Sequence, residues 1–157
     1  MRFRETDRWI KQKTKRTPLS VAASFLGITA RRCAELLAAF EERGELVDRA
    51  GGGRVVDVYP IAALGVWDIG TGSYKSELAD RAWATANLLH AAPWLKLSSE
   101  QRDLMSQSDD AVVASLVARA SAIGAVHPVP DQFAARAARE GWIALPSIDL
   151  SDLVDNA

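Results

Sequence analysis

Residues 26–44 contain the feature that most restricts how this chain can fold. Gly27 interrupts an apolar segment, and Thr29 is suited to cap a helix that starts directly after it. Within that helix, apolar side chains recur at positions i, i+3, i+4 and i+7, namely Cys33, Leu36, Leu37 and Phe40. This spacing produces one narrow apolar stripe, as in a helix that packs by a single side. The sequence therefore predicts a sharp turn at Gly27 and an amphipathic helix over 29–43.

The segment before this turn predicts two further helices. Residues 4–15 place Trp9 and other apolar residues on one side, and this helix ends near Pro18 because proline disfavours helix in the residue before it. A second, short helix is expected over 20–26, where Gly27 ends it.

The segment after Gly44 changes to a β pattern. Runs rich in β-forming residues over 45–49 and 54–59 flank a cluster of three glycines at 51–53. Two such runs around a glycine cluster predict a β-hairpin, which Pro60 ends.

A short helix, a glycine turn, a second helix and a hairpin in this order resembles the winged helix-turn-helix domain of DNA-binding transcriptional regulators. The residues that match the crossing of the helices, the turn and the buried side of the second helix are Ala23, Leu26, Gly27, Ile28, Cys33, Leu36 and Leu37. The resemblance covers about 17–60, or 4–60 with the preceding helix. Cys33 departs from the usual valine or isoleucine, but a buried thiol behaves as a small hydrophobe.

The resemblance implies a mainly α fold with a small β-hairpin wing. We expect an N-terminal winged helix-turn-helix domain over 1–60 and a linker or packing loop over 61–73. A C-terminal α-helical domain with an acidic tail is expected over 74–157.

The resemblance also implies that the helix over 29–43 reads the major groove, because a recognition helix enters the groove by its N-terminal turn. The residues at that end which do not pack inward are Thr29, Ala30, Arg31, Arg32 and Glu35. An arginine that contacts guanine O6 and N7 contributes about 1–3 kcal/mol of base discrimination. Glu35 can accept a hydrogen bond from a cytosine amino group or support an arginine, and Thr29 suits a phosphate. Which arginine contacts a base and which a phosphate stays open.

Further basic residues are candidates for contacts that do not depend on base sequence. Arg49 and Arg54 bracket the tip of the expected wing, where they can meet the minor groove or the backbone. Side chains in and after the first helix add salt-dependent attraction to phosphates: Lys11, Lys13, Lys15 and Arg16. The charge distribution agrees with this placement, because residues 1–60 carry 12 Lys and Arg against 8 Asp and Glu, whereas residues 61–157 carry 7 against 12.

The C-terminal helical domain contains large apolar side chains that need a partner surface, Tyr74, Trp83, Leu88 and Trp94. They fill the core of this domain, or they form a dimer interface or an effector pocket. Helix-turn-helix proteins usually bind DNA as two-fold dimers, so a homodimer is expected, with a protein partner as a second possibility.

No group of residues predicts catalysis. Residues 70–76 lack the first glycine of a phosphate-binding loop, and His90 and His127 have no ligand-spaced partners for zinc. The single cysteine, Cys33, excludes an internal disulfide and lies on the apolar stripe. We therefore expect a protein without enzymatic activity, cofactor or metal. The charged N-terminus and the lack of a long apolar run predict a cytoplasmic protein.

Together these features predict a sequence-specific, double-stranded DNA-binding repressor of transcription, of bacterial or mobile-element origin. One alternative is an accessory DNA-binding protein for plasmid or phage replication, partition or transfer, which uses the same fold. An alternative of another class is a protein-interaction adaptor or inhibitor, because winged helices also bind proteins and surface arginines are mostly solvated.

Overall fold

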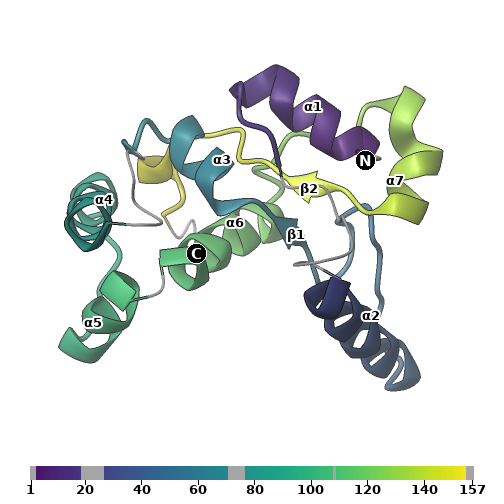
Figure 1. Cartoon of the computed structure of the whole chain (residues 1–157), viewed down its shortest axis with the longest axis horizontal. Coiled ribbons are helices and arrows are strands. Elements are labelled where there is room, and N and C mark those ends of the chain that lie inside the picture. The colour runs from purple at the N-terminus through teal and green to yellow at the C-terminus, as the bar shows by residue number, and fades with distance from the viewer. Residues whose placement is uncertain (1–2, 19–26, 71–76, 108, 155–157) are drawn as a thin grey trace. The chain divides into compact units, whose positions relative to one another are not determined.

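The computed structural model describes residues 3–18, 27–70, 77–107 and 109–154 of the 157-residue chain. Over these residues the chain is mainly helical, with two short strands (Figure 1). The α-helices are α1 (Glu5–Thr14), α2 (Gly27–Glu42), α3 (Pro60–Val66), α4 (Leu78–Ala91), α5 (Ser99–Gln107), α6 (Asp109–Ala122) and α7 (Ala134–Glu140). The strands are β1 (Asp57–Val58) and β2 (Ile143–Ala144), and the short 3-10 helices are η1 (Asp131–Phe133) and η2 (Leu150–Asp152). The predicted mainly α class is confirmed, and the small sheet is a parallel β1–β2 pair.

The chain divides into two compact units, each built from two stretches of sequence. Unit 1 comprises Met1–Asp57 and Pro128–Ala144, and unit 2 comprises Val58–His127 and Leu145–Ala157. The return of 128–144 to the N-terminal unit was not part of the expected division at residue 60. The linker expected over 61–73 is wrong in its first part, because α3 occupies it and Ala62, Ala63 and Leu64 are buried there.

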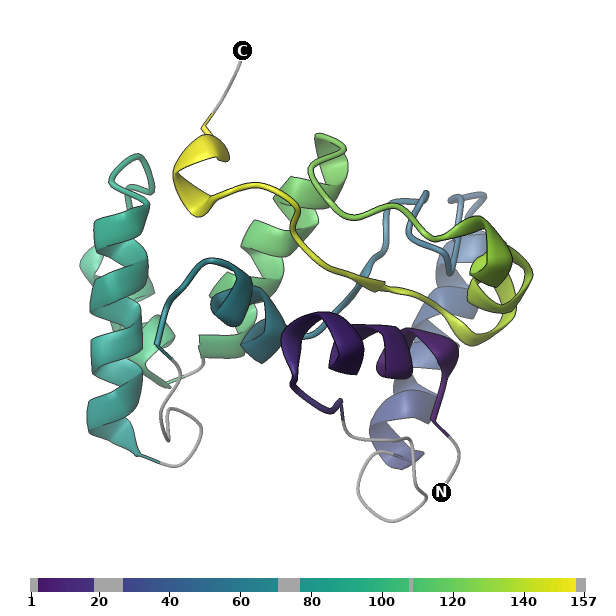
Figure 2. The same ribbon diagram turned by 90° about the horizontal axis from the view of Figure 1, so that it is seen from above.

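Unit 1 has an aromatic core between α1, α7 and β2, which lie next to one another (Figures 1 and 2). The ring of Trp142 lies 5.4 Å from that of Trp9 and 5.9 Å from that of Phe133, between centroids. Thr6 is buried beside them, and its hydroxyl accepts a hydrogen bond of 2.9 Å from the backbone N–H of Ile143. Because burying a large apolar side chain contributes about 1.5–3 kcal/mol, these residues anchor α1 to the chain around β2.

Helix α1 forms much as its sequence predicts, since both of its ends are satisfied by local hydrogen bonds. At its N-terminus the Asp7 carboxylate accepts from the backbone N–H of Arg4 at 2.9 Å. At its C-terminus Lys15 adopts a left-handed conformation, with a φ of 59°, and its N–H donates to the carbonyl of Lys11 at 2.9 Å. Acidic residues in the first turn and lysines in the last also suit the helix dipole.

Helix α2 matches its predicted extent but not its predicted packing. It begins at Gly27, so the sharp turn expected at that residue is wrong, and the preceding helix expected over 20–26 lies outside the described residues. None of its residues is buried, so the expected core stripe is wrong: Cys33 is exposed, Leu36 is 56% exposed, and Leu37 and Phe40 are only half-buried. The spacing of a stripe shows which side of a helix can pack, but it does not supply the surface that covers it.

The expected wing hairpin is also wrong, because residues 45–56 contain no strand. The chain instead turns around Asp48, whose carboxylate accepts from the N–H groups of Ala50 at 2.8 Å and Gly52 at 3.1 Å. The Asp48 carbonyl accepts from the Gly51 N–H at 3.0 Å. Because these amides donate to Asp48, they are not available for the hydrogen bonds of a hairpin. After the turn, β1 pairs instead with β2, which lies far away in the sequence.

Unit 2 buries α3 against α6, and α5 contacts both α4 and α6. The chain after β2 is fixed to this unit by side-chain donors: Trp67 Nε1 to Ile148 O at 3.2 Å, Trp94 Nε1 to Leu150 O at 3.3 Å and Arg119 Nε to Leu153 O at 2.8 Å. Leu150 and Leu153 are buried. Over the described residues up to 154, the expected acidic tail is therefore a packed segment of unit 2.

Candidate nucleic-acid interface

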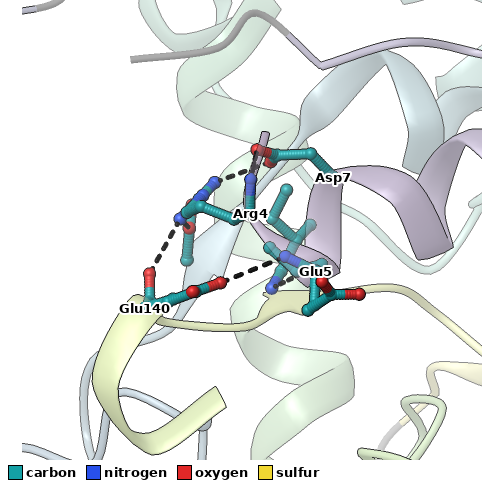
Figure 3. Close-up of polar contacts among 7 residues, drawn as sticks. Arg4, Glu5, Asp7 and Glu140 are labelled. Atoms are coloured by element: carbon teal, nitrogen blue, oxygen red, sulfur yellow. Dashed lines mark hydrogen bonds and ion pairs between the residues drawn. The ribbon is translucent and has the colours of Figure 1, made fainter. Parts of the chain in front are cut away.

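The first turn of α1 directs its acidic side chains toward other parts of unit 1 (Figure 3). Asp7 is only 2% exposed, and its carboxylate pairs with the Arg4 guanidinium at 3.1 Å. Arg4 also pairs with Asp57 at 2.7 Å. Burial alone would lower the pKa of Arg4. The Asp57 and Asp7 carboxylates raise this pKa by more than burial lowers it, so the pKa of Arg4 lies above its ordinary value. These carboxylates are therefore compensated inside the unit.

Glu5 joins α1 to α7. Its backbone N–H donates to the Glu140 carboxylate at 3.1 Å (Figure 3). Its own carboxylate pairs with both Arg8 and Arg136. The Glu5 side chain is 13% exposed, whereas those of Arg8 and Arg136 are 57% and 55% exposed. A largely buried carboxylate thus holds two arginines from different helices side by side with their outer parts in solvent.

Further cations lie near this pair of arginines. Arg8 and Lys11 are three residues apart, which puts them on one side of α1. Lys15 follows the helix as its left-handed C-cap, and its Nζ donates to the Gln12 carbonyl at 3.3 Å. Arg139 follows Arg136 by three residues on α7, and both are exposed. We call this surface the α1–α7 basic face; its residues are Arg8, Lys11, Lys15, Arg136 and Arg139.

Two other predicted DNA contacts on α1 lie apart from this face or at its edge. Lys13 is exposed, and its Nζ lies 5.8 Å from the centre of the Trp9 ring, on the flank that packs inward. Arg16 is half-buried after the end of the helix. The structure therefore groups Lys11 and Lys15, but not Lys13, with the arginines of α7.

The predicted recognition residues lie in solvent on the N-terminal half of α2. Thr29, Arg31, Arg32 and Glu35 are exposed, and Ala30 is half-buried. Arg31 Nε lies 3.8 Å from Glu35 Oε1, and both side chains are more than 60% exposed, at 73% and 63%. Exposed ion pairs of this kind contribute about 0–1 kcal/mol, so Arg31 remains available to another acceptor.

The arginines of the expected wing occupy different settings in the turn at 45–54. Arg49 is exposed, and its backbone carbonyl accepts from the Trp142 N–H at 2.9 Å. Arg54 is exposed but makes two contacts of 2.9 Å to the Glu45 carboxylate. Arg49 is thus the more available cation of the two.

Sequence reasoning missed Arg8, Arg136 and Arg139. The segment 128–144 carries two arginines and two acidic residues, so its composition gives no sign of a basic surface. Contacts across most of the sequence, such as the pairing of Glu5 with Arg136 and the Glu5 N–H bond to Glu140, place α7 beside α1. The spacing of Arg8 and Lys11 by three residues was a signal in the sequence that could have identified part of this face.

The residues proposed for a dimer or partner interface fall into three classes. Leu88 is buried in the core of unit 2, and Trp94 is half-buried, with its indole hydrogen-bonded within the same unit. Trp83 is 55% exposed on α4, and its ring lies so close to Gly70 that a Cβ there would be only 2.3 Å away. Tyr74 lies outside the described residues. Trp83 is thus the member of this group that the described structure leaves exposed.

Other site types have little support in the part of the chain that the structure describes. There, no three His, Cys, Asp or Glu side chains are grouped so that they could hold a metal ion. A cavity of about 140 Å³ is lined by Ala34, Leu37, Ala38, Glu41, Val47 and Arg49, and ligand pockets are usually larger, at about 300–1,000 Å³. No described helix is both long enough and apolar enough to cross a bilayer.

Comparisons with known proteins place the chain in a family. No curated protein and no solved structure matches it. Residues 1–135 match the family DUF429, which is described as a protein of unknown function. Because this match covers most of the 157 residues, the chain belongs to the DUF429 family.

Proposed function

We propose that the protein binds double-stranded DNA through unit 1 and regulates transcription. The observation that carries the proposal is the division of charge between the units. Unit 1 has 14 Lys and Arg against 10 Asp and Glu, and unit 2 has 5 against 10, which gives net charges of +4 and −5. The excess of positive charge in unit 1 comes from Met1–Asp57, because the returning segment 128–144 carries two arginines and two acidic residues. Clustered positive charge attracts the phosphate backbone, and the acidic unit is repelled by it.

The exposure of α2 supports its role as the helix that enters the major groove. Arg31 and Arg32 project from the leading half of an exposed helix, and among the described residues no strand or helix buries this half. The major groove admits an α-helix, and arginine pairs with guanine through two hydrogen bonds. In this proposal Thr29 contacts a phosphate, Arg31 and Arg32 contact bases or phosphates, and Arg49 contacts the backbone beside the helix.

The regulatory role proposed is repression by occupancy of a promoter, by a homodimer whose two-fold axis matches two half-sites. The same DNA-binding unit also suits an accessory role in plasmid or phage replication, partition or transfer.

A specific observation favours a second candidate, a protein-interaction adaptor. Helix α2 leaves Ile28 and Leu36 exposed, with Leu46 exposed in the segment that follows. Contiguous exposed apolar side chains are typical of surfaces that bind another protein. In the adaptor proposal these residues contact the partner, and the arginines of α2 surround the contact.

Removing both arginines of α2 tests the DNA-binding proposal. The variant Arg31→Ala with Arg32→Ala is compared with Lys96→Ala and Arg102→Ala, which removes the same charge from exposed positions of unit 2. Sites are first selected from genomic fragments, and affinity is then measured by fluorescence anisotropy. We expect the α2 variant to lose at least one base contact. A contact of about 1.4 kcal/mol corresponds to about a tenfold loss of affinity for the selected site. The control variant should retain its affinity.

Unchanged site affinity in a folded α2 variant would overturn the role assigned to Arg31 and Arg32. Failure of the unmodified protein to bind any duplex at low salt would overturn the DNA-binding function itself. In that case the adaptor candidate predicts a stoichiometric protein complex that Leu36→Asp dissociates.

A further inference from the structure

The α1–α7 basic face is positively charged because the acidic side chains of these helices are buried or half-buried while its basic side chains are exposed. In α1, Asp7 is buried against Arg4 and Glu5 is largely buried between Arg8 and Arg136. In α7, Glu140 is half-buried and accepts from the Glu5 N–H. Two carboxylates near these helices are exposed: Asp131 in η1 before α7, and Asp57 in β1, which pairs with Arg4. The outward charge of α1 and α7 is therefore almost entirely positive.

We propose that the α1–α7 basic face is a second contact surface for duplex DNA, which binds phosphates independently of α2. This inference rests on the proposed function, because it takes the same DNA as its ligand. It adds Arg8, Arg136 and Arg139 to the residues that contact DNA. Together with Lys11 and Lys15, they contact the phosphate backbone of the DNA and no base. Such contacts hold a protein on DNA without reading its sequence.

The cations of the face come from two helices that one carboxylate joins. Arg8 and Lys11 are three residues apart along α1, which at 1.5 Å per residue is roughly 4.5 Å. Arg136 lies beside Arg8 because both pair with Glu5, and one carboxylate cannot neutralise two guanidinium groups. A row of cations thus continues from α1 onto α7.

The apolar residues of α1 distinguish this surface from one that binds a membrane. A helix that lies in a bilayer interface buries an apolar side in the lipid, next to its cations. Here Trp9 and Ile10 are instead buried in the core of unit 1, where Trp9 contacts Trp142. The exposed side of α1 offers charge without an apolar anchor, which favours a hydrated polyanion such as DNA.

The salt dependence of DNA binding tests the inference. The variant Lys11→Gln with Arg139→Gln removes two cations of the face and leaves the Glu5 pairs in place. Lys96→Gln with Arg102→Gln removes the same charge from unit 2, and Lys11→Arg with Arg139→Lys keeps the charge of the face. Binding to a short duplex without a selected site is followed by anisotropy, and circular dichroism checks that each variant folds.

We expect the Lys11 and Arg139 glutamine variant to reduce the slope of log K against log[salt] by about 1.8, because each phosphate contact contributes about 0.9. The unit 2 control and the charge-keeping variant should retain the slope. The glutamine variant should show the same reduction in slope with a selected site. The Arg31 and Arg32 variant should instead lose its preference for the selected site.

A folded glutamine variant with the original slope would overturn this inference while leaving the proposed function standing. If the unmodified protein binds no duplex at low salt, the inference and the proposed function fail together. Binding to vesicles that contain phosphatidylserine, without binding to DNA, would show that the face serves a membrane and would also overturn the inference.

Discussion

At the scale of single residues, Arg4 connects three parts of unit 1. Its guanidinium contacts Asp7 in α1, Asp57 in β1 and, at 3.5 Å, the carbonyl of Glu140 at the end of α7. Of these partners, Asp7 is the buried carboxylate, and a buried carboxylate needs both hydrogen bonds and a counter-charge. The Arg4 guanidinium supplies the counter-charge and one hydrogen bond, and the Arg4 backbone N–H supplies another.

We expect Arg4→Met to lower the free energy of unfolding by about 2–3 kcal/mol. Removing one partner of a fully buried pair costs about 3–5 kcal/mol, and the Arg4 side chain is 26% exposed, which reduces that cost through solvent screening. The double variant Arg4→Met with Asp7→Asn should recover part of the loss, because the uncompensated charge is gone. Urea denaturation measures both values, and a double variant no more stable than Arg4→Met would contradict the explanation.

At the scale of elements, the turn at 45–54 is defined by close backbone approaches. A Cβ at Gly53 would lie 2.7 Å from the Leu46 carbonyl oxygen and 2.8 Å from the Asp48 nitrogen, both of them backbone atoms. A Cβ at Gly52 would lie 2.5 Å from the Asp48 carboxylate, which is the end of a side chain and can move. The backbone therefore restricts Gly53, whereas at Gly52 only a movable side chain is close.

The two alanine variants of this turn should therefore differ in stability. We expect Gly53→Ala to cost about 1–3 kcal/mol, as overpacking does where backbone must shift. Gly52→Ala should cost less, because Asp48 can rotate away and lose only its hydrogen bonds to Ala50 and Gly52. Thermal unfolding of the two variants measures the difference. Equal costs, or a larger cost for Gly52→Ala, would show that the turn has another structure.

Local sequence patterns predicted single elements well and their partners poorly. The periodicity around Trp9 identified α1, and the repeat from Cys33 to Phe40 identified α2, because both depend on residues within two turns of helix. The burial of the α2 stripe and the wing hairpin were wrong, because both depend on which surface meets the element. In the candidate site, Lys11 and Lys15 followed from local charge, whereas Arg136 required knowledge of a contact across most of the chain.

At the scale of the whole molecule, the chain leaves unit 1 at Asp57 and returns to it for 128–144. This return supplies Trp142 to the core of unit 1 and Arg136 to its surface. The same stretch therefore completes both the hydrophobic packing and the basic face. Unit 2, in contrast, gathers the excess of acidic residues and fixes its C-terminal segment with Trp67, Trp94 and Arg119.

The central claim is that DNA contacts unit 1 by its exposed cations. An NMR titration of the 15N-labelled protein with duplex DNA at low salt tests it most directly, residue by residue. We predict shifts at Arg8, Lys11, Arg136 and Arg139 on the basic face and at the start of α2, all reversed by added salt, while α4 and α5 of unit 2 keep their resonances. Shifts confined to unit 2, or none at all, would contradict the account.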